Sequence, residues 1–276
     1  GNSIKMSKIG IISGGGKLPV LIGKNLIEQN YEVIFFVIED TFNKNIYSNL
    51  NTIEIKLNSI KKIFNQLKEN NIKKIVLAGN IIRPSLKDIN FDFETLNFAK
   101  KLFLSKKGDN DLLISITNLF QNKGFEYLDW KIYCSELFSN KKNLTIIKPS
   151  KEASLNLDKA LKVFKNYGQL DIGQSIVIQN EIVLGLEAAE GTNNLILRCN
   201  DLKKNGDKGI LFKASKYNQS NILDIPTIGK ETLNLLIKND YEGIFIEKNK
   251  CIIIDKKETI NLANKNNLFI SKFEKN

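Results

Sequence analysis

The chain has 276 residues, and basic side chains exceed acidic ones by enough to give a formal net charge of +11. Because single domains usually contain about 100–150 residues, this length favours two domains. The apolar runs, such as VIFFVI at 33–38, are far shorter than the roughly 20 residues of a membrane-spanning helix. The composition therefore indicates a soluble protein of two domains.

Lysine supplies nearly all of the positive charge and is spread along the chain, so the charge does not indicate a nucleic-acid partner, and we expect none. Histidine is absent, which removes the commonest general base and metal ligand. Cys134, Cys199 and Cys251 are isolated and form no CxxC pair. These thiols, with no secretory pattern before the first strand, favour a reducing cytoplasmic location.

In the first half, apolar runs alternate with segments of helical periodicity, which predicts parallel strands joined by crossover helices. We predict strands at 8–13, 32–38 and 73–78, and helices at 17–29 and 58–69. Helical segments at 92–104 and 109–122 and a weaker apolar stretch at 125–138 follow. The sequence thus predicts an α/β fold whose N-terminal, Rossmann-like parallel-sheet domain covers residues 6–140 and binds a nucleotide.

Residues 139–154 are polar and contain one of the four prolines, so the boundary is placed there. A helix at 155–167 and a hairpin turning at Asn180 follow. We then expect a strand at 209–215, a helix within 227–239, a second hairpin over 243–255, and a terminal helix and strand. Residues 141–276 are accordingly predicted to form a mixed α/β domain that binds lipid and phosphate and carries catalysis.

Three glycines, Gly14, Gly15 and Gly16, separate the first predicted strand from the first helix. Such a turn can direct backbone N–H groups towards an anion, although a tight turn without a ligand explains it equally well. The run lacks the Gly-Lys-Ser/Thr of a P-loop and the last glycine of GxGxxG. Glu39 and Asp40 end the second strand as a ribose-binding acid would, which leaves an NAD-dependent oxidoreductase as a weaker alternative.

Two further motifs of the first half carry candidate ligand-binding residues. In LAGNIIRPSL at 77–86, Asn80 and Arg83 follow a strand at the edge where parallel sheets bind ligands. Arg83 is one of only two arginines and could hold a phosphate through two hydrogen bonds, or contact uridine. In KKGDNDLL at 106–113, Asp109 is typical of a helix N-cap, with a magnesium or ribose contact as the alternative.

Three motifs of the second half place polar residues at strand ends. Asp224 stands in an extended turn where it could bind magnesium or activate water. Thr227 is expected to cap the next helix, and Lys213 to end a strand. The other candidates lie in LDIGQSIVI and LGLEAAEGT; they are Asp171, Gln174, Glu187, Glu190, Gly191 and Thr192.

Taken in order, GIISGGGKLP, LAGNIIRP, KKGDNDLL, LDIGQSIVI, LEAAEGT, LFKASK and DIPTIG resemble the motifs of the LpxI-type UDP-2,3-diacylglucosamine pyrophosphatases. The resemblance runs from about residue 8 to the C-terminus. It implies a cytoplasmic enzyme of lipid A synthesis in Gram-negative bacteria. That enzyme uses magnesium to hydrolyse UDP-2,3-diacylglucosamine to UMP and 2,3-diacylglucosamine 1-phosphate (lipid X).

The resemblance also implies a homodimer and a substrate cleft between two domains. It assigns the essential acid to Asp224, and we predict catalysis by Asp224, Lys213 and Glu190, with Asp224 and Glu190 holding the metal. In this family a second acid often follows the positions of Asp109 and Thr192, where this chain has Asn110 and Asn193. The residues predicted to bind substrate are Gly14, Gly15, Gly16, Asn80, Arg83, Asp109, Asp171, Gln174, Gly191, Thr192 and Thr227.

An alternative hypothesis is a non-catalytic nucleotide-sugar or lipid-binding protein with the same fold. It would bind the UDP-lipid without releasing UMP. In either case a substrate with two acyl chains comes from the inner membrane, and the lysine excess favours peripheral contact with that anionic surface.

Overall fold

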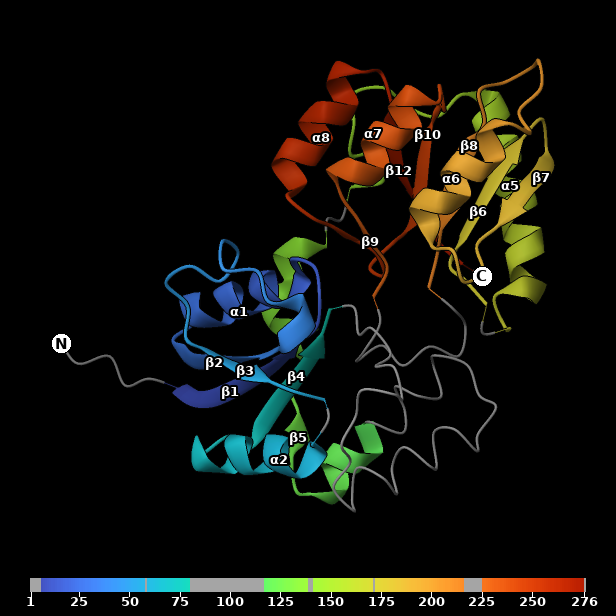
Figure 1. Cartoon of the computed structure of the whole chain (residues 1–276). Coiled ribbons are helices and arrows are strands. Elements are labelled where there is room, and N and C mark those ends of the chain that lie inside the picture. The colour runs from blue at the N-terminus through green and yellow to red at the C-terminus, as the bar shows by residue number, and fades with distance from the viewer. Residues whose placement is uncertain are drawn as a thin grey trace. The chain divides into compact units, whose positions relative to one another are not determined.

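The structure is a computed structural model that describes residues 6–57, 59–79, 117–138, 141–170, 172–215 and 225–275 (Figure 1). The described residues divide into two compact units, with the division between Ser135 and Glu136. Each unit contains its own five-stranded sheet. Within the described ranges, no helix combines the length and the apolar character needed to cross a membrane.

The first unit contains a parallel sheet in the order β3-β2-β1-β4-β5. This arrangement confirms the Rossmann-like prediction. The strands are β1 (Met6–Ser13), β2 (Tyr31–Ile38), β3 (Thr52–Ile55), β4 (Lys74–Ala78) and β5 (Glu126–Tyr127). Its helices include α1 (Leu18–Glu28), α2 (Ile60–Glu69) and a helical segment at 117–122, with 3₁₀ turns η1 (Glu39–Thr41) and η3 (Trp130–Leu137).

The apolar runs of β1, β2 and β4 are continuous because both faces of this sheet are covered. On one face, Phe64 and Leu67 of α2 pack in a core with Phe36 of β2. On the other face, a Cβ added at Gly23 of α1 would lie 2.1 Å from the ring of Phe35, so that helix packs tightly on β2. The short strand β3 was not predicted, although its sequence TIEI alternates polar and apolar residues, because four residues are a short signal.

The glycine run lies where β1 ends, beside the end of β4. The Gly14 N–H donates to the Ala78 carbonyl at 2.8 Å, which extends the pairing of these strands into the loop. Gly79 follows at φ +91°, and a Cβ there would lie 2.7 Å from the Gly15 carbonyl oxygen. Gly16 also has a positive φ, of +87°, but open space surrounds its Cβ position. Gly79 therefore lets the backbone of the glycine run approach β4 closely.

These two glycines form a matched pair for a stability test. We expect Gly79→Ala to lower the free energy of unfolding by about 3 kcal/mol, since a left-handed φ and a backbone clash add. Gly16→Ala should lower the free energy of unfolding by only about 1 kcal/mol, because the positive φ is the only source of strain at this position. Urea unfolding of both variants measures the difference. Equal losses would show that the close approach at Gly79 does not contribute.

The second unit has a mixed sheet in the order β12-β10-β8-β6-β7. This confirms the predicted mixed α/β fold. Its strands are β6 (Ser175–Gln179), β7 (Ile182–Leu186), β8 (Ile210–Lys213), β10 (Gly243–Glu247) and β12 (Phe269–Phe273), with a separate parallel pair of β9 (Thr227–Ile228) and β11 (Ile252–Ile253). Its helices are α5 (Lys151–Tyr167), α6 (Thr192–Asn200), α7 (Lys230–Lys238) and α8 (Lys256–Lys265).

The two predicted hairpins of this unit have different outcomes. β6 and β7 pair antiparallel through a turn at Asn180 and Glu181, both with positive φ, as predicted. The second hairpin, over 243–255, is wrong: β10 pairs parallel with β8 and β12, and β11 pairs parallel with β9. Asn249 has a left-handed backbone conformation and does turn the chain. However, β10 and β11 each pair with strands from elsewhere in the sequence.

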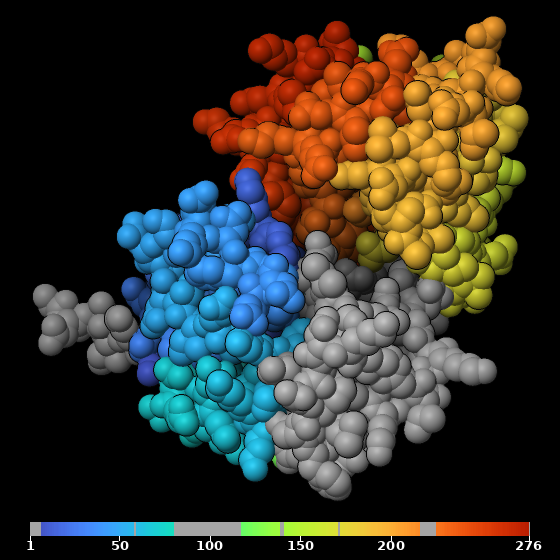
Figure 2. Space-filling view, viewed as in Figure 1, coloured from blue at the N-terminus to red at the C-terminus, as the bar shows by residue number. Residues whose placement is uncertain are grey.

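The sheet of the second unit separates two apolar cores. Phe164 of α5 packs with Phe212 and Phe245 on one face. Leu195 of α6 and Leu233 of α7 pack with residues of α8 and of the sheet on the other. The solvent-facing sides of α6, α7 and α8 form much of the surface of this unit seen in Figure 2. Residues at the strand ends therefore lie between a packed sheet and the starts of its covering helices.

Candidate functional site

The candidate site begins at one edge of the second sheet. Ser175, the first residue of β6, pairs with Lys213, the last residue of β8, because these strands are antiparallel. The neighbouring strand β7 ends at Leu186 on the same edge, where the Glu187 N–H donates to the Ser175 carbonyl at 2.9 Å. The carboxyl ends of strands form the edge where α/β sheets bind ligands. The fold thus brings three separate sequence motifs to one place.

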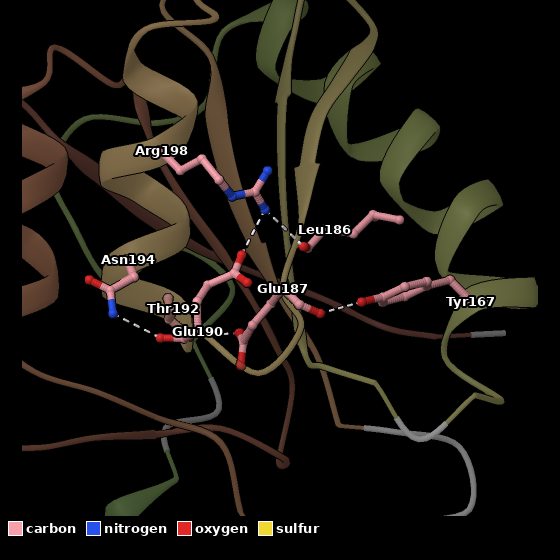
Figure 3. A network of polar contacts seen from close by, with 7 residues as sticks. All are labelled: Tyr167, Leu186, Glu187, Glu190, Thr192, Asn194 and Arg198. Atoms are coloured by element: carbon pink, nitrogen blue, oxygen red, sulfur yellow. Dashed lines mark hydrogen bonds and ion pairs between the residues drawn. The ribbon is translucent and has the colours of Figure 1, made fainter.

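The Thr192 hydroxyl connects these motifs, and Figure 3 shows its contact with Glu187. It donates to Glu187 Oε2 at 2.9 Å, and it lies 3.0 Å from Ser175 Oγ and 3.2 Å from Lys213 Nζ. A threonine hydroxyl has one proton and two lone pairs, so Ser175 and Lys213 must both donate to it. All three hydrogen-bonding positions of Thr192 are filled. The arrangement fixes the direction of the lysine side chain.

Lys213 is the most deeply buried cation among the predicted site residues, with 8% of its surface exposed. Its Nζ also donates to the Thr227 main-chain carbonyl at 2.9 Å. The prediction that Thr227 caps α7 is wrong, because Thr227 lies in β9 and the N-cap position is Gly229, with no side-chain cap. The contribution of Thr227 in the structure is therefore a carbonyl oxygen that holds Lys213.

Glu190 is paired with Arg198, 2.7 Å from carboxylate to guanidinium, on the exposed side of the same turn (Figure 3). The hydrogen bond from Arg198 keeps the pKa of Glu190 below its usual value, so this carboxylate is ionised at neutral pH. Arg198 also donates to the Leu186 carbonyl at 3.2 Å, which ties α6 to the end of β7. The predicted roles of Glu190 in catalysis and metal binding stay predictions.

Tyr167, at the end of α5, donates from its hydroxyl to the Glu187 main-chain carbonyl. Burial raises the pKa of Tyr167 to about 12, with the negative charges of Glu187 and Glu190 adding to the effect. The tyrosine therefore stays protonated at neutral pH and acts as a hydrogen-bond donor. It anchors the turn from β7 to α6 from the opposite face of the sheet.

The remaining predicted residues are distributed over both units. Gly14, Gly15 and Gly16 lie in the first unit, before α1, which starts without a side-chain cap. In the second unit the Gln174 carbonyl accepts from the Ala214 N–H at 2.9 Å, and Gly191, at φ +82°, is the N-cap of α6. Five predicted residues lie outside the described residues: Asn80, Arg83, Asp109, Asp171 and Asp224.

The acidic residues near Lys213 do not by themselves form a magnesium site. Among the described parts of the chain, no group of three or more His, Cys, Asp or Glu residues is arranged to hold a metal. Glu190 is occupied by Arg198, and Glu187 accepts from Thr192. Magnesium prefers several oxygen ligands in octahedral geometry. A metal site would need Asp224 or other ligands beyond those described here.

Both halves of the chain match known family models. Residues 8–137 match the LpxI N-terminal domain, and residues 140–271 match the LpxI C-terminal domain. The chain belongs to the LpxI family. One relative is the UDP-2,3-diacylglucosamine pyrophosphatase LpxI of Caulobacter vibrioides, which is 29% identical over 272 residues, covering 96% of this chain and 97% of the relative. The resemblance drawn from the ordered motifs is confirmed, and the LpxI assignment covers both units.

Sequence reasoning overlooked Ser175 and Lys272 as members of this edge. Ser175 is fully buried yet polar, and three apolar residues follow it in β6. Lys272 stands in FISKF, in which every residue is buried. A lysine at an inward position of a buried strand was the signal that could have identified it, since lysine is rarely buried.

Proposed function

We propose that this LpxI-family chain hydrolyses the pyrophosphate of UDP-2,3-diacylglucosamine to UMP and 2,3-diacylglucosamine 1-phosphate in lipid A synthesis. The observation that carries the proposal is the match of both units to a relative with that activity in its name, over nearly the full length of each protein. The match includes both units, so the proposal takes account of the whole described chain.

The chemistry of the Lys213 edge supports the proposal. Cleavage of a phosphoanhydride places negative charge on the phosphate that leaves, and a preorganised cation lowers the cost of that charge. Lys213 is desolvated and its direction is fixed by Thr192 and by the Thr227 carbonyl. A buried ammonium group interacts with phosphate more strongly than one surrounded by water. Its role would be to neutralise a phosphate oxygen.

We also propose that turnover depends on magnesium, held in part by Asp224. A bound magnesium ion would supply charge neutralisation and a water of lowered pKa. In the absence of histidine, the water would transfer its proton to a carboxylate, and Asp224 is the residue proposed for that role.

The cellular setting follows from the proposed substrate. The nucleotide part is polar and the acyl chains are membrane lipids, so the enzyme would work in the cytoplasm at the inner-membrane surface. The net charge of +11 favours attraction to anionic lipids. A homodimer is proposed from the family resemblance alone.

The deciding experiment is an assay of UMP release from UDP-2,3-diacylglucosamine by the purified protein, with magnesium and with EDTA. We expect release with magnesium and none with EDTA. Release that persists in EDTA would remove the metal from the mechanism. Tight binding of the lipid with no UMP release, in magnesium or manganese, would favour the alternative of a non-catalytic nucleotide-sugar or lipid-binding protein.

A further inference from the structure

A second lysine lies in the same row of the sheet as Lys213. Ile246 of β10 pairs with Lys213 on one side and with Lys272 of β12 on the other. Paired residues of parallel strands project from the same face, so both lysines lie on the face covered by α6, α7 and α8. Two strand spacings separate their Cα atoms, about 10 Å.

The neighbouring row on the same face of the sheet, two residues away along each strand, is entirely apolar. Val177, Leu211, Ile244 and Ile270 pair in sequence across the same four strands, and all four are fully buried in one core. One step along the strands the row becomes Ser175, Lys213, Ile246 and Lys272. The face of the sheet thus changes from an apolar core to a cationic edge within two residues.

Lys272 is buried as deeply as Lys213, with 5% of its surface exposed. The segment around Lys142 lies along the edge of β12, where the Lys272 N–H donates to the Lys142 carbonyl at 2.8 Å. Burial, with the positive charges of Lys256 and Lys248 nearby, lowers the pKa of Lys272 to about 8, while Cys251 opposes the shift. The fold keeps a lysine where its positive charge is unfavourable.

The charges of Lys213 and Lys272 both affect the pKa of Cys251. Burial raises the pKa of its thiol to about 12, while the charges of Lys213 and Lys272 both act to lower it and that of Glu247 to raise it. The thiol lies in the same apolar core, at the start of the β11 segment. A small anion near it would be attracted by both lysines at once.

We propose that Lys213 and Lys272 together form a binding site for a phosphate group at the edge formed by β8, β10 and β12. The ligand class is a phosphate dianion or a diphosphate, and Lys272 is the second cation. Its part in turnover rests on the proposed function, but phosphate binding itself does not. A bound phosphate would be attracted by the ammonium groups of both Lys213 and Lys272.

The test is a titration of the full chain with inorganic phosphate, pyrophosphate and UMP, followed by NMR of lysine labelled with carbon-13 at Cε. We compare wild type with Lys272→Met, which keeps the length of the stem, and Lys272→Arg, which keeps the charge. Lys208→Met is the matched control, since Lys208 is an exposed lysine of the same unit. We expect Lys272→Met to lower the affinity for at least one of these ligands tenfold or more. Lys272→Arg should retain most of the wild-type affinity.

Thermal unfolding without ligand separates binding from a structural role. The Tm of Lys272→Met without ligand shows whether this variant is folded under the conditions of the titration. In wild type, the Lys272 Cε resonance should shift on adding the ligand, a readout that needs no variant. Unchanged affinity for all three ligands in a folded Lys272→Met, or an unmoved resonance at saturation, would overturn the site.

The three ligands also identify the source of the phosphate. A preference for UMP assigns the site to the nucleotide phosphate, and a preference for pyrophosphate assigns it to the bridging diphosphate. Phosphate binding that depends on Lys272 in a protein without UMP-releasing activity would support the site and contradict the proposed function. UMP release by the wild-type protein, together with unchanged affinity of Lys272→Met for all three ligands, would support the proposed function and contradict the site.

Discussion

Asp224→Asn is expected to lower UMP release by a factor of about 10⁴ or to abolish it, the largest effect of any single substitution proposed for this chain. Asparagine has nearly the same shape as aspartate but cannot accept a proton from water or carry the charge that holds a metal. The proposed role comes from the family motif DIPTIG. Substrate affinity should change little, and a binding titration with the intact UDP-lipid would measure it.

The matched control is Asp158→Asn, which removes an exposed carboxylate from α5. That variant should release UMP at the wild-type rate. The proposal for Asp224 would be contradicted if Asp224→Asn hydrolysed the substrate nearly as fast as wild type. Another acid would then have to activate the water.

Lys213→Met is expected to reduce turnover about 10²–10³-fold, the usual cost of removing one preorganised donor from a developing charge. Methionine keeps much of the apolar stem, so the packing against the sheet should persist. The change leaves the Thr227 carbonyl without its 2.9 Å donor, which costs about 1–3 kcal/mol of stability, partly offset by loss of a buried charge. Initial rates and urea unfolding measure the two effects separately.

Lys208→Met again serves as the control, because that lysine stands before β8, is exposed and forms a surface ion pair of 3.4 Å with Asp240. Surface pairs of this kind contribute little to stability. Lys213→Arg should recover part of the rate if positive charge is what matters. A folded Lys213→Met with wild-type turnover would exclude Lys213 from the reaction.

Much of the first unit could be predicted from the sequence, because its elements repeat a strong local signal. Continuous apolar runs in β1, β2 and β4 are separated by periodic helices, and this alternation leaves few topologies. β3 was missed because a four-residue edge strand has too few positions for a clear pattern. The role of Gly79 was not predicted, although its lack of a Cβ allows the close approach of the glycine run.

In the second unit the same local reasoning failed where strands find distant partners. β10 and β11 follow each other with a turn between them, which is typical of a hairpin. The structure pairs β10 with β8 and β12, because its apolar side chains are buried on both faces only in the middle of the sheet. Thr227 was expected to cap a helix, yet it contributes a carbonyl to Lys213.

The sequence alone determined the class of fold, the family through its ordered motifs, and which residues stand at strand ends. These properties depend on residue types and spacings that are read along the chain. Tertiary structure decided that Thr192 joins Glu187, Ser175 and Lys213, and that Lys272 lies in the same row as Lys213. The physical reason is that sheet register sets these contacts, and register depends on pairing between strands far apart in sequence.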